Sequence, residues 1–359
     1  MSESQPALTL GSSPASLTRR FIGLVFFAVL IGPNCIPAAI AAPTPQEVDR
    51  SLSRAISYLA SQQQASGAWR APQGESMAMT SLTLMAFMAT GHVPSEGPHG
   101  KNMERAIRWV VDRQLPTGLL AMNQVHGIMY EHGICTLMLA EVAGMVDEPL
   151  ASRVRTSLAA AVKLILQAQA VPKVNQHVGG WRYSATSNDS DLSATGWQLL
   201  ALRAAKDVGC DVPSASIEAA VSYVKRCTAR PGGFSYMPGD GVTATRTGTG
   251  ILCLEVCGNH HAPETIAAAQ FLRRRPPRYQ DGWFFYGAYY SSIGMFKVGG
   301  DYWTETRDAL TTELIAHQAG DGAWTGNSTN EFSNGPIYCT SLATLALAVE
   351  YQYLPIYQR

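Results

Sequence analysis

The sequence predicts an all-α fold, a six-unit α/α toroid in which outer and inner helices alternate along the chain. Two observations predict it. A turn with glycine and an aromatic residue (Leu120 in the second turn) recurs at intervals of 41 to 61 residues, a period typical of repeat architectures. Each turn follows an amphipathic helix and precedes a more apolar one, so each unit supplies one outer and one inner helix.

The turns share one pattern. Glycine permits a tight reversal after a helix, and an aromatic side chain then covers the joint between neighbouring units. The glutamine that precedes several of these turns can satisfy open main-chain groups at a helix end. We therefore assign a structural role to the aromatic residues of the turns, which are Trp69, Trp181, Phe234, Trp283 and Trp324.

The helices are expected from the spacing of their apolar residues. Outer helices are predicted at 48–62, 102–114, 154–169, 216–227, 264–273 and 303–318. Inner helices are predicted at 80–87, 136–140, 195–202, 249–254, 291–296 and 340–347. A helix that is apolar on nearly every side must be surrounded by protein. Complete turns at both ends of the repeat favour a closed ring over an open superhelical solenoid.

Residues 1–41 are predicted to be a signal peptide. Arg19 and Arg20 precede an apolar run at 21–31, and the alanines at 39 and 41 offer a small-residue cleavage site before Ala42. We expect export to the periplasm or extracellular space, with a retained N-terminal membrane anchor as the alternative. A single toroid domain then spans residues 42–359. It carries six cysteines whose pairing the sequence leaves open.

Composition limits the partners. With 27 basic and 27 acidic residues the formal net charge is zero, so we expect no nucleic-acid partner. The sequence contains no phosphate loop, dinucleotide fingerprint, His-Glu-x-x-His or Gly-x-Ser-x-Gly motif, so we expect no cofactor. Peripheral membrane contact and the oligomeric state are left open.

The turns resemble the QW repeats of squalene–hopene and oxidosqualene cyclases and the Gly-Gly-Phe turns of protein prenyltransferase β-subunits. Over about residues 45–359 the chain more closely resembles secreted bacterial prenyltransferase/squalene-oxidase-repeat proteins. That likeness is carried by the segments at 130–133, 179–183, 195–198 and 354–359. It implies the α/α-toroid fold of the terpenoid cyclase superfamily, whose bacterial repeat proteins mostly lack an established reaction.

The same resemblance implies a candidate acid. The segment from Asp189 to Leu192 is similar to the Asp-x-Asp-Asp motif with which squalene–hopene cyclases protonate an alkene. Asp191 matches the proton donor and Leu192 replaces the last aspartate, so Asp191 and Asp189 are the candidate catalytic residues. The competing interpretation is that Asp191 or Ser193 caps the helix that follows.

In protein prenyltransferases the corresponding segment binds zinc through Asp-x-Cys. Here Ser193 stands where the thiolate belongs, and Tyr338 lies near the place of the histidine ligand. Zinc requires soft ligands in tetrahedral array, so we predict no metal site. A substitute set of His126, His132 and Asp191 is the minor alternative.

Aromatic residues are expected at one end of the ring, where they can bind substrate or stabilise a cation. The candidate substrate-binding residues are Tyr183, Trp197, Tyr236, Tyr286, Tyr289, Tyr290, Tyr338 and His132. The leading hypothesis is a cyclase-like protein that cyclises or binds an isoprenoid or triterpenoid in an aromatic cavity. The alternatives are a non-catalytic exported scaffold for lipid, glycan or protein, and a polysaccharide lyase or hydrolase. A ring filled by its own side chains would favour the scaffold.

Overall fold

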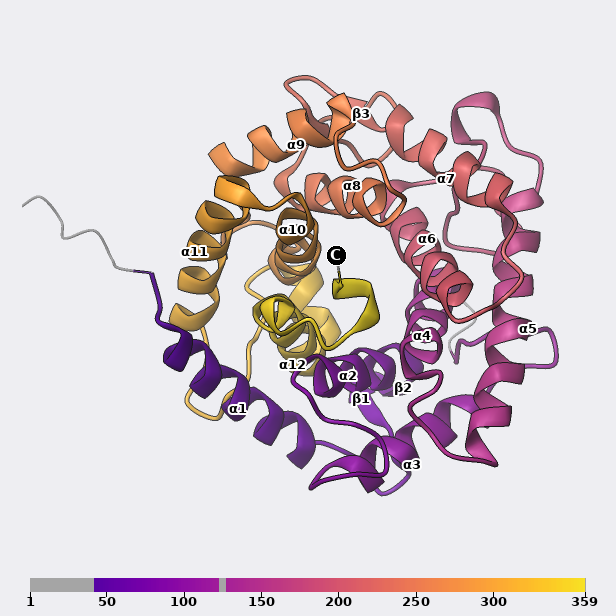
Figure 1. Cartoon of the computed structure of the whole chain (residues 1–359), viewed down its shortest axis with the longest axis vertical. Coiled ribbons are helices and arrows are strands. Elements are labelled where there is room, and N and C mark those ends of the chain that lie inside the picture. The colour runs from indigo at the N-terminus through magenta and orange to yellow at the C-terminus, as the bar shows by residue number, and fades with distance from the viewer. Residues whose placement is uncertain (1–41, 123–126, 359) are drawn as a thin grey trace, which may run out of the picture. The chain divides into compact units, whose positions relative to one another are not determined.

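The computed structural model describes residues 42–122 and 127–358. Within them, twelve α-helices form two concentric rings (Figure 1). The predicted α/α toroid is thereby confirmed. The predicted signal peptide lies outside the described residues. None of the helices described is long and apolar enough to cross a membrane.

The helices alternate between the two rings. The inner ring contains α2 (Met77–Ala89), α4 (Ile128–Val142), α6 (Leu192–Asp207), α8 (Ala244–Val256), α10 (Phe284–Val298) and α12 (Thr329–Leu347). The outer ring contains α1 (Pro45–Ser61), α3 (Gly100–Val111), α5 (Leu150–Ala170), α7 (Ser214–Arg226), α9 (Pro263–Arg274) and α11 (Gly300–Ala316).

Short elements lie between these helices. Two antiparallel pairs form at turns, β1 (Trp69–Ala71) with β2 (Gly74–Ser76), and β3 (Thr228–Ala229) with β4 (Gly233–Phe234). In the first pair Trp69 lies opposite Ser76. Three 3₁₀ turns complete the described chain: η1 (Asn175–His177), η2 (Val349–Tyr351) and η3 (Pro355–Tyr357).

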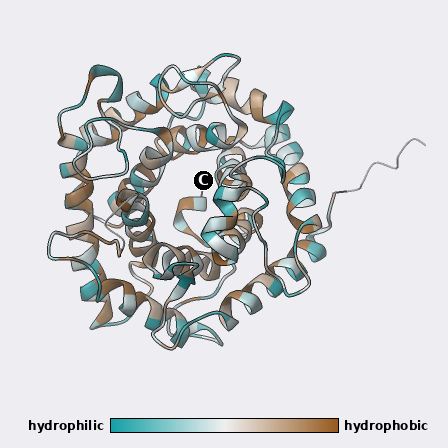
Figure 2. Ribbon diagram, turned by 180° about the vertical axis from the view of Figure 1, so that it is seen from behind, coloured by the Kyte–Doolittle hydropathy of each residue, from teal (hydrophilic) through white to brown (hydrophobic). Residues whose placement is uncertain are grey.

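Burial explains which helices are inside. Every residue of α2 is buried, whereas α3 buries one side only. Coloured by hydropathy, the inner helices are mostly apolar and the outer helices alternate between polar and apolar residues (Figure 2). A one-sided helix can face solvent and an all-apolar helix cannot, so the two sequence patterns sort the helices into two rings.

The inner ring is closed, because α12 contacts α2. At that seam the hydroxyls of Thr83 and Ser341 are hydrogen-bonded at 3.1 Å. The inner helices run parallel to one another: in α8 and α10, for example, Gly287 lies beside Thr245 and Gly248 beside Ser291. Their N-termini therefore gather at one end of the ring and their C-termini at the other.

A glutamine clamp joins each of four units to the next. Its side-chain amide donates one hydrogen bond to the turn glycine's carbonyl and a second to a carbonyl in the following outer helix. The distances to the two carbonyl oxygens are 2.8 and 2.8 Å for Gln63, 2.9 and 2.9 Å for Gln114, 2.8 and 2.9 Å for Gln169, and 3.0 and 2.9 Å for Gln318. The clamp of Gln318 reaches Ser51 in α1, so it fastens the last unit to the first.

The aromatic residues of the turns are packed between the rings. The indole N–H of each of three tryptophans donates to a carbonyl of its own unit's outer helix: Trp69 to Leu59 at 2.7 Å, Trp181 to Ile165 at 2.8 Å, and Trp324 to Leu314 at 2.7 Å. These tryptophans and Phe234 are fully buried. Trp283 differs, since it is half-buried and precedes α10 with a φ of 64°.

Candidate functional site

Asp191 lies at the N-terminal end of the inner ring, where it is the N-cap of α6. Its Oδ1 accepts a hydrogen bond from the main-chain N–H of Ala194 at 2.8 Å. The main-chain N–H of Asp191 donates to the carbonyl of Trp181 at 2.9 Å, so the turn before α6 fixes the position of the carboxyl. The capping interpretation of Asp191 therefore holds for one of its two oxygens.

The second oxygen of Asp191 faces a different environment. Oδ2 lies 3.6 Å from Nε of Arg182 and has no hydrogen-bond partner among the described residues. Burial raises the pKa of this carboxyl to about 6, although the Ala194 N–H and the Arg182 guanidinium oppose the rise. The Tyr130 hydroxyl donates to Oδ1 at 3.4 Å. Asp191 can thus take up or release a proton near neutral pH.

Next to Asp191, two tyrosines and two arginines form a surface that we call the aromatic face. It consists of Tyr183, Tyr236, Arg182 and Arg246. The Arg182 guanidinium lies 4.6 Å from the ring centre of Tyr183 and 5.4 Å from that of Tyr236. Arg246 lies 4.8 Å from the Tyr236 ring, and the two tyrosine hydroxyls are hydrogen-bonded. Tyr183 is 39% exposed. The aromatic face combines open aromatic surface with fixed cations.

Asp189 borders the aromatic face. One of its carboxylate oxygens lies 3.4 Å from Nη1 of Arg182, and its side chain is 40% exposed. The two candidate catalytic aspartates therefore share one guanidinium, but only Asp191 is buried.

The remaining predicted aromatic residues are packed inside the inner ring. Trp197 stacks on Tyr289 with ring centres 5.4 Å apart and contacts Tyr290 edge-on at 5.3 Å. The Tyr286 hydroxyl is hydrogen-bonded to Thr249 at 2.7 Å. None of these residues, nor Tyr338, is more than 8% exposed. They fill the ring, and they do not line an open cavity.

His132 is also buried, and main-chain groups occupy both of its ring nitrogens. Nδ1 accepts from the N–H of Leu120 at 3.1 Å and Nε2 donates to the carbonyl of Ala161 at 3.1 Å. Burial lowers the pKa of the imidazole to about 4, so it is neutral at pH 7. In four other turns a threonine hydroxyl accepts the same main-chain N–H: Thr80, Thr195, Thr247 and Thr340. His132 thus replaces a structural threonine, and His126 lies outside the described residues.

Sequence reasoning missed two further carboxyls at this end of the ring. Glu331 in α12 accepts hydrogen bonds from the N–H groups of Phe285 and Tyr286, at 2.8 and 3.3 Å. Burial raises its pKa to about 7. Glu131 in α4 accepts from the N–H of Ala78 at 3.1 Å. Each caps the preceding inner helix, and the only sequence signal for this is an acidic residue near the start of an inner helix.

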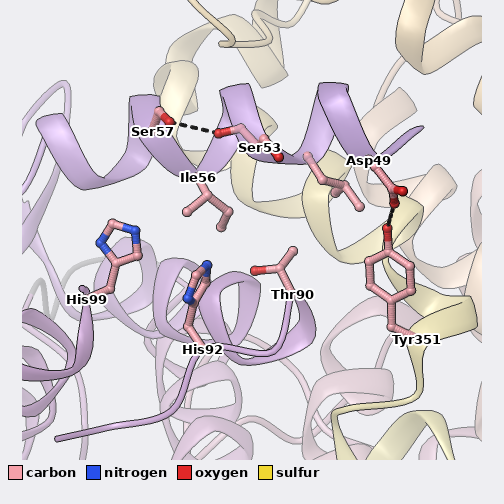
Figure 3. Close-up of a pocket in the computed structure, with 9 residues that line it drawn as sticks. Asp49, Ser53, Ile56, Ser57, Thr90, His92, His99 and Tyr351 are labelled. Atoms are coloured by element: carbon pink, nitrogen blue, oxygen red, sulfur yellow. Dashed lines mark hydrogen bonds between the residues drawn. The ribbon is translucent and has the colours of Figure 1, made fainter. Parts of the chain in front are cut away.

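A separate hollow of about 390 Å³ lies between α1 and the segment that follows α2 (Figure 3). Its walls include Ser53, His92 and His99, and Tyr351 donates a hydrogen bond to Asp49 at its far end. None of the predicted site residues lines it.

Comparison with known proteins identifies the family. The family model described as the prenyltransferase alpha-alpha toroid domain matches residues 34–127 and 162–287, more than half of the chain. The chain belongs to this family. No curated protein matches the sequence.

Solved structures with a similar fold include two kinds of enzyme. The type II terpene cyclase MstE from Scytonema superposes with a TM-score of 0.58 at 14% identity, covering 86% of this chain and 100% of its own. An α-1,6-mannanase from Salegentibacter sp. HEL1_6 gives 0.64 at 10% identity, covering 85% and 99%. A glycosidase complexed with glucose gives 0.57 at 14%, covering 87% and 100%. The fold is therefore shared by terpene cyclases and glycosidases.

Proposed function

We propose that the protein is an exported, non-catalytic α/α-toroid scaffold that binds a glycan on its aromatic face. One observation carries the proposal: the interior of the inner ring is filled by the chain's own aromatic side chains, none more than 8% exposed. A cyclase substrate requires an open apolar cavity beside the acid, and among the described residues these packed aromatic side chains leave none open there. We therefore place the ligand-binding surface at the N-terminal end of the ring, on the aromatic face.

The chemistry of the aromatic face suits a hydroxyl-rich ligand. Arg182 lies over the Tyr183 ring, but the residue remains 39% exposed, and the C–H face of a sugar can stack on the part of the ring that is uncovered. Arg182 and Asp189 beside it supply charged hydrogen-bonding groups, and bonds of this kind are stronger than neutral ones. An isoprenoid would remove water from the Arg182–Asp189 ion pair and offer no hydrogen-bonding group in return, which costs free energy. The arrangement therefore favours a glycan over an apolar molecule at this surface.

The test is binding of an oligosaccharide panel to the mature chain, measured by isothermal titration calorimetry. We expect Tyr183→Ala to weaken binding by about tenfold or more, because one stacking surface is worth on the order of 1.4 kcal/mol. Tyr353→Ala is the matched control, since Tyr353 is an exposed tyrosine of the C-terminal segment (56%). Binding that survives Tyr183→Ala unchanged, or no binding to any glycan, would refute the proposal.

A second candidate function is favoured by Asp191. A carboxyl with a pKa raised to about 6 and one oxygen without a hydrogen-bond partner can act as a general acid. MstE, whose fold is similar, has been solved with geranylgeranyl dihydroxybenzoate as its substrate. In this alternative the chain is a cyclase-like protein that protonates an isoprenoid with Asp191. The scaffold and the cyclase differ in what the mature chain does to a polyprenoid.

Incubation with geranylgeranyl-containing substrates, followed by mass spectrometry, separates the two candidates. A cyclised product that disappears in Asp191→Asn would establish the cyclase, since asparagine keeps the capping oxygen but cannot donate an acidic proton. No product from wild type, together with glycan binding that depends on Tyr183, would establish the scaffold.

A further inference from the structure

The C-terminal segment from Gln352 to Gln358 folds back into the inner ring. Figure 1 shows it in yellow at the centre, surrounded by the inner helices. Leu354, Ile356 and Tyr357 are buried there, Tyr357 completely. This is the C-terminal end of the ring, opposite Asp191, so the segment, which we call the plug, is independent of the aromatic face.

Among the described residues, three hydrogen bonds join the plug to the inner ring, each to a different inner helix. The Tyr357 hydroxyl donates to the carbonyl of Leu345 in α12 at 3.0 Å, and Lys297 in α10 donates to the carbonyl of Gln358 at 2.6 Å. The third is long: the N–H of Ile356 donates to Oε2 of Glu141 in α4 at 3.4 Å. The buried side chains of Leu354 and Ile356 add apolar contact to these bonds.

The residue that precedes the plug, Tyr351, is held in place by a hydrogen bond. Tyr351 donates a hydrogen bond to Asp49 on α1 (Figure 3). The next residue, Gln352, has a φ of 54°, in the left-handed region that residues with side chains rarely occupy. The chain turns at Gln352 to enter the ring, so a rotation of the backbone there would move the plug while Tyr351 stays bound to Asp49.

Besides the position of the plug, the carboxyl of Glu141 points to a ligand. Its side chain is 1% exposed, and Oε1 has no hydrogen-bond partner in the described part of the chain. A buried polar atom without a partner is rare in native proteins, because its desolvation is not compensated. The plug therefore satisfies Glu141 incompletely, with one long bond to one oxygen.

We propose that the plug covers a ligand site inside the inner ring, and that the site takes an apolar molecule with a single hydroxyl, bound beside Glu141. The side chain of Tyr357 has this chemistry itself, an apolar ring with one hydroxyl. A ligand that displaces the plug occupies the space of Leu354, Ile356 and Tyr357 and gives Glu141 the partner it lacks. The site does not depend on glycan binding at the aromatic face.

The test uses the mature full-length chain with 1-dodecanol as the probe and dodecane as its apolar counterpart. In Tyr357→Ala the plug loses its buried ring and its bond to Leu345. We therefore expect one dodecanol per chain to bind at least about tenfold more tightly than to wild type, and dodecane to bind less tightly than dodecanol. Hydrogen exchange of residues 352–358 is expected to rise on binding, because the plug leaves the ring.

Two further variants make the test decisive. Tyr353→Ala alters an exposed residue of the same segment and is expected to behave like wild type. Tyr357→Phe removes only the hydroxyl, and about a three- to tenfold gain is expected; it replaces the alanine variant if that protein does not fold. The proposal is overturned if the folded variants bind dodecanol no more tightly than wild type, or if binding leaves residues 352–358 protected.

Discussion

Glu141→Gln is expected to stabilise the protein at neutral pH. Burial raises the pKa of Glu141 from its ordinary value of 4.5 to about 8, so the folded chain keeps a proton that the unfolded chain releases. Wild-type stability then falls as pH rises from about 4.5 to about 8, by about 1.4 kcal/mol per pH unit. At pH 7 the accumulated cost is about 3 kcal/mol. Glutamine has the same shape and no proton to lose, so the variant avoids this loss of stability.

Urea unfolding, followed by circular dichroism, measures this difference. Glu141→Gln is expected to match the free energy of unfolding of wild type at about pH 4 and to exceed it by about 3 kcal/mol at pH 7. Asp191 and Glu331 titrate in both proteins, so their contributions cancel. Glu96→Gln is the control, because Glu96 is exposed. A difference that stays constant with pH, or a variant less stable than wild type at pH 7, would refute the reasoning.

Three further predictions concern the ring and its processing. Gly179→Ala should lower the free energy of unfolding by at least about 3 kcal/mol, because a Cβ there lies 2.2 Å from a main-chain carbonyl oxygen of the next outer helix. Gly209 has a similar φ of 90° but open space around it, so Gly209→Ala should cost about 1 kcal/mol. Equal losses of stability in thermal unfolding would contradict the close packing at Gly179. Gln318→Ala should destabilise the chain by about 2–3 kcal/mol, as much as Gln114→Ala, since both clamps join neighbouring units. A negligible loss for Gln318→Ala in urea would argue against closure in solution. Mass spectrometry of the protein from its host should find Ala42 as the first residue, and a full-length chain would favour the retained anchor.

Much of the fold follows from the sequence, because each helix carries its own periodicity. The boundaries that were missed have local causes. Helix α1 begins at Pro45, earlier than periodicity predicts, because Thr44 and Glu47 form a capping box. Helix α12 begins at Thr329 and is kinked at Gly335, where φ is 83°. Apolar spacing detects only the part of α12 that follows the kink.

The candidate site was harder to predict, because it depends on contacts between units. Tyr286, Tyr289 and Tyr290 were predicted to bind substrate, and the structure places them in the packed interior. Whether a helix face meets a cavity or another side chain depends on the width of the ring, which no local pattern encodes. Arg182 was missed although it lies in the segment 179–183, which carries part of the family resemblance. Glu141 was missed because an acidic residue near a helix end is usually exposed.

The clamp from Gln318 to Ser51 spans 267 residues of sequence, and this separation has a consequence for biogenesis. The first helix to be made finds its outer-ring neighbour only when the last unit has been synthesised. Until then the growing chain has two unsatisfied edges, and loop-closure entropy opposes their meeting. A chain of this kind completes folding late. Joining the termini and cutting between two other units would move that late step to a new seam, and the folding rate of such circular permutants would report on it.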